Sequence, residues 1–341
     1  SPQCRTSDAT EFNDSGASFY RFTGDTGLVS DGIDTYKSLV QSALPSPAGQ
    51  NSVSTTYSGT AVSNNVNTGL DASATDSLVL IKARDFATDW YWLDSQRGIG
   101  KFISSNNTNA EGTAAQMLTN FTSTGFTVGT DANVNTSGRT YSTHQLLEAS
   151  KFLDIIKDTG SGAAKTVAHS LGGDVGCIIS SNTTDVSDWA VYYHTLSIGT
   201  GATLKMTNDG VVTDATVWDS TAATSTEFSV GTSNLSNGSG DTIIHYVFSK
   251  DICKSFNGSG ISGLEVNFGY KPKAVIIKRA TAGTIGNYRI YDSLIGLMNT
   301  NGTLSTNTSI VFTGTGITIN STDSDVNAAG SSYILIAIPE V

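Results

Sequence analysis

The sequence is poor in charged residues and has no long apolar run. Asp, Glu, Lys and Arg make up 14% of the 341 residues, whereas an average soluble protein has roughly 25%. The formal net charge of −11 comes without a basic cluster, which argues against binding to the phosphate backbone of nucleic acids. No apolar run approaches the roughly 18 residues typical of a membrane-spanning helix, so membrane insertion is not expected.

Cysteine and histidine are also scarce. The three cysteines, Cys4, Cys177 and Cys253, lie far apart and show no metal-ligand or redox spacing. They are expected to be free or buried thiols. The four histidines are scattered along the chain, so neither a metal centre nor a catalytic triad is indicated.

Proline is rare, with 5 residues, and Ser, Thr, Asn and Gly take the place of the missing charge. Short runs of Val, Ile, Phe, Tyr and Thr are separated by turns rich in Gly, Asn and Ser. This pattern predicts an all-β protein.

One apolar run occurs three times in the sequence. The copies are Leu78–Arg84, Gly176–Ser181 and Ala274–Arg279. From Ile81 to Ile179 is 98 residues, and from Ile179 to Ile277 is 98 again. A period of this length indicates tandem domains, because the units of solenoids are shorter.

Each copy opens alike, at residues 57–60, 159–162 and 257–260, and continues with an aromatic cluster, a turn that ends in glycine and a last strand. The repeat domains are therefore set at residues 51–150, 151–250 and 251–341. Each is expected to be a β-sandwich of about six to eight antiparallel strands. The three domains are expected to form an elongated string.

Residues 1–50 lack the repeat pattern and are interpreted as an N-terminal arm with a linker. Asp34 is expected to cap a short helix that ends before Pro45, and residues 42–56 read as the linker. The segment 1–41 is either an attachment or assembly arm, or an extra hairpin on the first domain.

Residues 168–173 resemble the nucleophile elbow of lipases, with Ser170 at the place of the nucleophile. An elbow needs a strand, a sharp turn and then a helix above a parallel sheet. Residues 174–179 instead read as a turn followed by a strand, and the chain shows no βα alternation. Ser170 is therefore expected in an ordinary turn, and no catalytic residue is assigned.

Two loops place oxygen-bearing side chains at alternate positions, as calcium loops do. They are residues 131–138 and 323–330. The aligned middle loop has Leu235 at a ligand position. The alternative is a hairpin turn, because Asn and Gly tolerate positive φ and Asn or Asp can bond its own backbone. No metal or other cofactor is assigned, and calcium in these two loops stays open.

Six aromatic residues near the apolar runs are candidates for a surface that binds sugars or a receptor. They are Trp90, Trp92, Trp189, Tyr192, Tyr193 and Tyr288. In a strand, Trp90 and Trp92 share one face while Tyr91 takes the other. One face therefore belongs to a core, and the alternative is that these aromatics are core residues.

The third copy resembles a repeat found in virion structural proteins of tailed bacteriophages, often described as tail fibre proteins. The segments that carry this resemblance are residues 268–279, 288–293, 326–330 and 333–337. The first copy matches at residues 90–98, 105–106, 110–111, 125–126 and 134–138, and the second matches at residues 166–172 and 188–192. The resemblance covers about residues 51–341, and it implies a virion location, with the tail favoured over the capsid exterior.

Together these features predict a non-enzymatic virion protein, a tail fibre or spike component that contributes to host attachment. The resemblance implies other virion proteins and further copies of the chain as partners, with a homotrimer as one form, and a glycan or protein of the host cell surface. Three alternatives stay open: a decoration or fibre protein of the head exterior, a secreted bacterial adhesin or carbohydrate-binding protein, and a tailspike that cleaves glycans. The last needs two carboxylates across a cleft.

Overall fold

The computed structural model describes residues 21–22, 28–29, 51–196, 201–206, 210–281, 288–294, 296–298 and 309–339. The chain divides into two compact units, Ser1–Gln50 and Asn51–Val341. In the first unit, β1 (Arg21–Phe22) pairs antiparallel with β2 (Leu28–Val29). The helix expected after Asp34 lies outside the described residues. The predicted linker extends too far, because the first strand of the second unit begins at Ser52.

The first repeat folds into two antiparallel sheets. Its strands are β3 (Ser52–Ser58), β4 (Asn64–Asn67), β5 (Ser77–Ala83), β6 (Tyr91–Asp94), β7 (Lys101–Ser104), β8 (Gly112–Thr113), β9 (Asn120–Thr122), β10 (Gly125–Val128) and β11 (Thr140–Leu147). The larger sheet has the order β3-β11-β5-β6-β7-β8, and the smaller has the order β4-β10-β9. A single helical turn, α1 (Ala132–Asn135), precedes β11.

The second repeat uses the same plan. Its strands are β12 (Leu153–Thr159), β13 (Lys165–Ala168), β14 (Val175–Asn182), β15 (Ala190–Tyr193), β16 (Ala202–Lys205), β17 (Val211–Thr213), β18 (Glu227–Val230) and β19 (Thr242–Ser249). They form sheets of order β12-β19-β14-β15-β16-β17 and β13-β18. The helical turns are α2 (Ala215–Trp218) and α3 (Asn234–Asn237).

The third repeat follows a short 3-10 turn, η3 (Lys250–Ile252). Its strands are β20 (Cys253–Asn257), β21 (Leu264–Asn267), β22 (Pro272–Arg279), β23 (Arg289–Asp292), β24 (Gly296–Met298), β25 (Ile310–Phe312), β26 (Gly316–Ile319) and β27 (Ser332–Pro339). The sheets have the orders β20-β27-β22-β23-β24 and β21-β26-β25. The helical turn α4 (Ser324–Asn327) precedes β27.

Each repeat is a sandwich whose two sheets pack their apolar faces together. In the first repeat, Val79 and Ile81 of the larger sheet and Phe126 and Val128 of the smaller sheet belong to one buried cluster. Corresponding clusters fill the second and third repeats. The prediction of an all-β protein built from three sandwich-like repeats is confirmed. None of the helices in the described part of the chain is long and apolar enough to cross a membrane.

The structural alignment of the second repeat with the other two differs by one residue from the alignment that the equal spacing predicts. The fourth residue of β11, β19 and β27 pairs with Ile81, Ser180 and Ile277, respectively. The true spacings are therefore 99 and 97 residues, although their mean is 98. A shift of one residue turns a side chain to the other face of the sheet. Ile179, which the equal spacing matches to Ile81, accordingly lies on the opposite face, where it lines a small cavity of about 10 Å³ between the second and third repeats.

The outer faces of the larger sheets are also buried. On β5, the residues that alternate with the core residues are Leu78, Leu80 and Lys82, and each is at most 2% exposed. The same holds on β6 for Trp92 and Asp94, which have no exposed surface. A sheet that is buried on both faces must be covered by something beyond its own sandwich partner, and here the cover is the other repeats.

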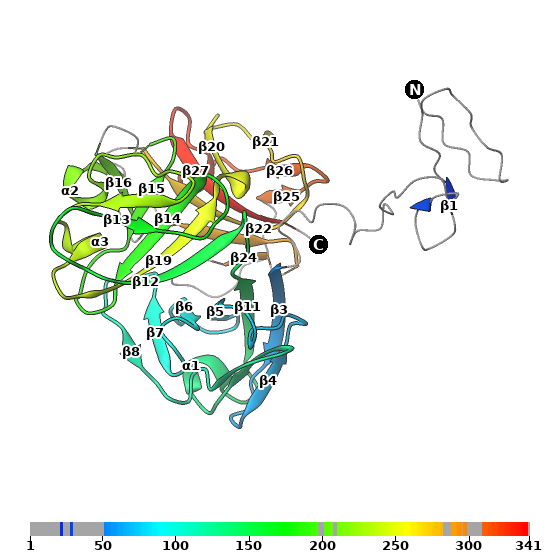
Figure 1. Cartoon of the computed structure of the whole chain (residues 1–341). Coiled ribbons are helices and arrows are strands. Elements are labelled where there is room, and N and C mark those ends of the chain that lie inside the picture. Colours follow the sequence, from blue (N-terminus) through cyan, green and yellow to red (C-terminus); the bar gives the residue numbers. More distant parts are fainter. Residues whose placement is uncertain are drawn as a thin grey trace. The chain divides into compact units, whose positions relative to one another are not determined.

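Each repeat contacts the other two, so the three form a closed ring around these outer faces. In Figure 1 the first repeat lies below the second and the third. The contacts at its three junctions include Trp92–Trp189, Tyr193–Leu335 and Ser105–Tyr288. The last of these joins the first repeat to the third, with the two hydroxyl oxygens 2.5 Å apart. The first and third members of a linear string do not touch, so the prediction of an elongated string is wrong.

The same pair of strands meets at every junction. The last residue of β6, β15 or β23 contacts the last strand of a neighbouring repeat, which is β19, β27 or β11, respectively. These pairs are Asp94 with Tyr246, Tyr193 with Leu335, and Asp292 with His144. Because the three junctions use equivalent elements, a rotation about a common centre relates the repeats, as in a cyclic trimer.

Candidate functional site

A short surface loop of the same conformation follows the first strand of each repeat. We call residues 60–62, 161–163 and 259–261 the rim loops. In the first rim loop, the Asn135 side-chain amide donates to the carbonyl oxygens of Val62 and Gly129, both at 2.6 Å. Its Oδ1 atom accepts from the Thr60 backbone N–H at 2.8 Å. Asn135 has no exposed surface, so this brace anchors the loop from inside the sandwich.

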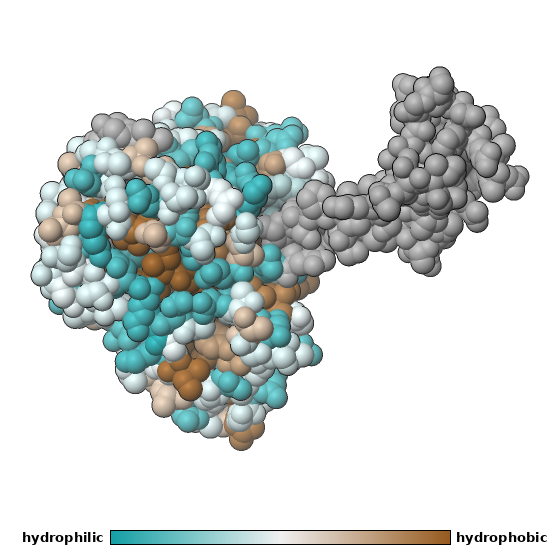
Figure 2. Space-filling model, viewed as in Figure 1, coloured by the Kyte–Doolittle hydropathy of each residue, from teal (hydrophilic) through white to brown (hydrophobic). Residues whose placement is uncertain are grey.

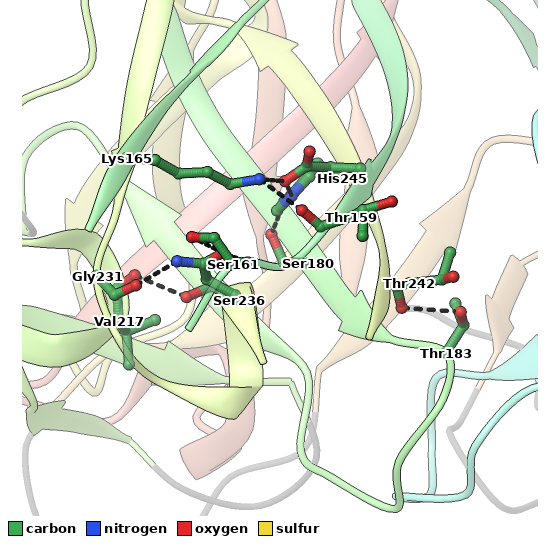
Figure 3. A network of polar contacts seen from close by, with 12 residues as sticks. Thr159, Ser161, Lys165, Ser180, Thr183, Val217, Gly231, Ser236, Thr242 and His245 are labelled. Carbon is green, nitrogen blue, oxygen red and sulfur yellow. Dashed lines mark hydrogen bonds and ion pairs between the residues drawn. The ribbon is translucent and has the colours of Figure 1, made fainter. Parts of the chain in front are cut away.

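The other two rim loops have the same brace. Asn237 donates to the Ala163 carbonyl at 2.7 Å and accepts from the Ser161 N–H at 2.7 Å. The Asn237 amide also donates to the Gly231 carbonyl at 2.5 Å, and Figure 3 labels Ser161 and Gly231 of this network. Asn327 bonds the Ile261 carbonyl and the Ser259 N–H, both at 2.8 Å. Three buried amides at equivalent positions thus hold three loops in one geometry.

A hydroxyl group and a left-handed residue complete each rim loop. The hydroxyls of Thr60, Ser161 and Ser259 donate to the carbonyl two residues ahead, at 3.0, 2.7 and 3.0 Å. The residue between has a φ of +68° at Gly162 and +69° at Gly260, but it is alanine, with a φ of +58°, at position 61. Since a Cβ atom disfavours this region, the first rim loop carries backbone strain that the other two avoid.

The glycine before each rim loop is required by close packing. An added Cβ atom at Gly59, Gly160 or Gly258 would overlap a backbone carbonyl oxygen. In each case this oxygen belongs to the residue that directly follows the helical turn α1, α3 or α4, respectively. The backbone of the helical turn thus lies directly against the entry to the loop, which leaves the loop little freedom to move.

The tip of each rim loop exposes an apolar side chain. Val62 is 61% exposed and Ile261 is 70% exposed, and the smaller Ala163 is exposed at the equivalent place. The face drawn in Figure 2 is mostly hydrophilic or neutral, with small and separate hydrophobic areas. The tips are therefore single exposed aliphatic side chains on rigid loops, not parts of one continuous apolar patch.

A polar network lies beside the second rim loop (Figure 3). Lys165 Nζ contacts Asp158 Oδ2 and the Thr159 carbonyl, each at 2.7 Å. His245 Nε2 lies 3.9 Å from Asp158 Oδ2, and its Nδ1 lies 2.6 Å from the Ser180 hydroxyl. Burial raises the pKa of Asp158, but the contacts with His245 and Lys165 outweigh it and lower the pKa to about 2. The network thus fixes a carboxylate at the base of the loop.

Ser180, His245 and Asp158 are the three residue types of a hydrolytic triad. However, neither Ser180 nor His245 has exposed surface. A nucleophile must reach the carbonyl that it attacks, and the sandwich encloses this hydroxyl. The elbow-like Ser170 lacks the helix that an elbow needs after the nucleophile. Its hydroxyl donates to Asp154 at 3.1 Å, and a loop and then β14 follow it rather than a helix. The strand expected after this segment is confirmed.

The two loops considered for calcium are helix-capping turns. Asp131 Oδ1 accepts from the Asn133 N–H at 2.8 Å, and Asp323 Oδ1 accepts from the Asp325 N–H at 2.9 Å. These two loops contain Asn135 and Asn327, whose side-chain amides brace the first and third rim loops. Within the described residues, no group of three or more His, Cys, Asp or Glu side chains is placed to hold a metal ion. The arrangement therefore supports the hairpin-turn alternative.

The six aromatics proposed as a binding surface are buried, with at most 2% of each exposed. Tyr192 lies in the core of the second sandwich. Trp92 and Trp189 pack edge to face, with ring centroids 5.2 Å apart, at the junction of the first two repeats. The prediction of a surface patch is wrong, because the outer sheet face that holds most of these rings is the centre of the ring of repeats.

The rim loops were visible in the sequence only as the similar openings of the three copies. A Gly followed by Thr or Ser stands there at 59–60, 160–161 and 258–259. The bracing Asn lies 75, 76 or 68 residues farther along the chain. The pairing of loop and amide therefore needed the structure.

No curated protein matches this chain. A family model described as a domain of unknown function, DUF7483, matches residues 48–152 and again residues 146–341. Together the two matches span the ring of repeats, and a second match within one chain agrees with an internal repeat. The chain therefore belongs to the DUF7483 family of domains of unknown function.

Proposed function

We propose that the chain is a non-enzymatic structural protein of a bacteriophage particle, a tail fibre or spike component that attaches through its rim loops. The observation that carries this proposal is the threefold occurrence of a braced loop with an exposed apolar tip. The resemblance of the repeats to virion structural proteins supports the particle, and the enclosed Ser180 hydroxyl argues against hydrolysis.

Rigid loops suit attachment because they lose little conformational freedom when they bind. Ordering a mobile interface side chain costs about 0.5–1.5 kcal/mol, and the buried amides have already ordered the loop backbone. The chain has three of these loops, one in each repeat. A partner that engages more than one of them gains avidity of roughly 10²–10⁴ from the linked contacts.

Attachment is tested with the labelled full chain and cells on which the source particle grows. The double variant Val62→Ser/Ile261→Ser removes the two large tips, and we expect it to bind at least tenfold more weakly. The control is Val186→Ser, because Val186 is 72% exposed but lies outside the rim loops. Equal binding by the wild type and the double variant would contradict attachment through the rim loops.

The location is tested separately with a gold-labelled antibody on intact particles. Label at the tail is the expected result. Label over the head would instead assign the chain to the capsid exterior, with the rim loops as contacts to other capsid proteins. Particles without label would contradict a virion protein altogether.

A further inference from the structure

We propose that the junction between the third and first repeats is an acid-sensitive clasp, and that proton uptake by His144 opens the ring of repeats there. The chain does not pass directly between these two repeats, and the contacts His144–Asp292 and Ser105–Tyr288 join side chains there. Each repeat also has its own sandwich core. Separation would expose part of the outer faces of the larger sheets, but it would not disrupt a sheet.

The three junctions use equivalent strands, but the side chains that meet there differ. At the first junction, the Tyr246 hydroxyl donates to Asp94 at 2.7 Å. At the second, the Tyr193 hydroxyl donates to a backbone carbonyl of β27 at 3.3 Å. At the third, the same position holds His144, whose Nδ1 lies 3.6 Å from Asp292 Oδ2. Only this one of the three contacts contains a side chain that ordinarily titrates between pH 5 and 8.

His144 is enclosed on every side. It is 2% exposed, its Nδ1 lies 2.8 Å from the Ser54 hydroxyl, and its ring packs near Trp90 with centroids 6.0 Å apart. Its Nε2 has no hydrogen-bond partner among the described residues. The charged groups that face it are Asp292 on β23 and Lys273 on β22. A proton on this imidazole would therefore be stabilised by one carboxylate and opposed by one ammonium group.

The direction of the effect follows from this environment. Burial lowers the pKa of His144, Asp292 raises it, and Lys273 lowers it, with a net decrease from the ordinary value of 6.5. A base whose pKa is lowered in the closed ring binds protons better once the ring opens. The closed junction is thus fully stable above the ordinary pKa and loses stability as the pH falls below it. The nearby Ser105–Tyr288 contact separates with it.

The test is small-angle X-ray scattering of the full chain at about pH 7.5 and about pH 5, with far-UV circular dichroism to follow the strands. We expect the radius of gyration to rise by roughly a tenth at the lower pH while the strand signal is unchanged. His144→Gln should remain compact at both values. The control is His194→Gln, which changes a half-buried histidine that does not lie at this junction.

A second variant acts in the opposite direction. Asp292→Asn removes the carboxylate that supports a charged His144, so opening should begin at a higher pH than in the wild type. This result stays informative if His144→Gln fails to fold. The clasp is overturned if the wild type keeps its dimensions at the lower pH, or if opening occurs at the same pH in the wild type and in Asp292→Asn.

Discussion

The Tyr246 hydroxyl of the second repeat donates to the Asp94 carboxylate of the first, across 2.7 Å. Asp94 has no exposed surface, and its Oδ2 atom also accepts from Arg97 Nε at 2.5 Å. Arg97 in turn donates to the Trp92 carbonyl at 2.7 Å. A buried carboxylate of one sandwich is thus satisfied partly by a neighbour, which couples the stability of the two repeats.

We expect Tyr246→Phe to lower the free energy of unfolding by about 1.5–3 kcal/mol, because the lost hydrogen bond is made to a buried charged group. Urea denaturation measures this change. The control is Tyr57→Phe, which removes a hydroxyl bond to a neutral carbonyl within the first repeat, 2.7 Å long. That loss should cost only about 0.5–1.5 kcal/mol. Equal effects of the two variants would show that the junction bond has no special weight.

Asn237→Asp should destabilise the second repeat and loosen its rim loop. The change replaces an amide that donates at 2.7 and 2.5 Å with a carboxylate that cannot donate. Leaving buried carbonyls without donors costs about 1–3 kcal/mol each. Faster cleavage after Lys165 by a lysine-specific protease is the expected readout. Asn234→Asp makes the same chemical change at an exposed position of α3 and should leave the cleavage rate as it is.

Ala61→Gly should stabilise the protein by up to about 1 kcal/mol, since glycine adopts the left-handed conformation without the penalty of a Cβ atom. The φ of Ala61 is +58°, and the equivalent residues are already Gly162 and Gly260. Thermal unfolding followed by circular dichroism measures the shift. Ala163→Gly is the matched control at an ordinary φ, and it should be neutral or destabilising. A lower melting temperature for Ala61→Gly would contradict strain at this loop.

Glu148 should make stability fall as the pH rises from about 4.5 to about 7. Burial raises the pKa of Glu148, and the neighbouring Asp154 and Asp76 raise it further, to about 7 from an ordinary 4.5. The folded protein therefore holds this proton over a range in which the unfolded chain has released it, and ionisation disfavours folding.

Glu148→Gln should remove this part of the pH dependence and stabilise the protein above pH 7. Urea midpoints measured across the range test it, with the exposed Glu227→Gln as the control that keeps the wild-type profile. A profile that is unchanged in Glu148→Gln would assign the slope to other groups.

The sequence predicted the sandwiches better than their packing, and particular residues show why. The run Leu78–Ile81 is apolar at every position, and a strand buried on one face only would alternate. The continuous run is therefore a signal of a strand covered on both faces, although we did not predict this from the sequence. It could not indicate that the cover is the equivalent face of another repeat, because apolar faces carry no partner-specific pattern.

The second repeat resembles the other two less closely in sequence. Tyr57 stacks on Tyr141 in the first repeat, with ring centroids 5.2 Å apart, and an equivalent pair stacks in the third. The second repeat has Asp158 and Ile243 at these places, paired across the same strands. Its network of Asp158, His245 and Lys165 replaces the aromatic stack. A substitution that keeps the architecture but changes the chemistry leaves little signal in a single sequence.

Because the ring is closed, the gene could start at any of the three repeats as long as their cyclic order is kept. Ser52, Leu153 and Cys253 begin the same strand in the three larger sheets. The chain crosses from one repeat to the next through residues 148–152 and 250–252, so a linker of similar length from Pro339 to Ser52 should bridge the remaining gap. A gene rearranged to start at the second repeat and finish with the first would then encode the same ring of repeats, with the ends of the chain at a new place.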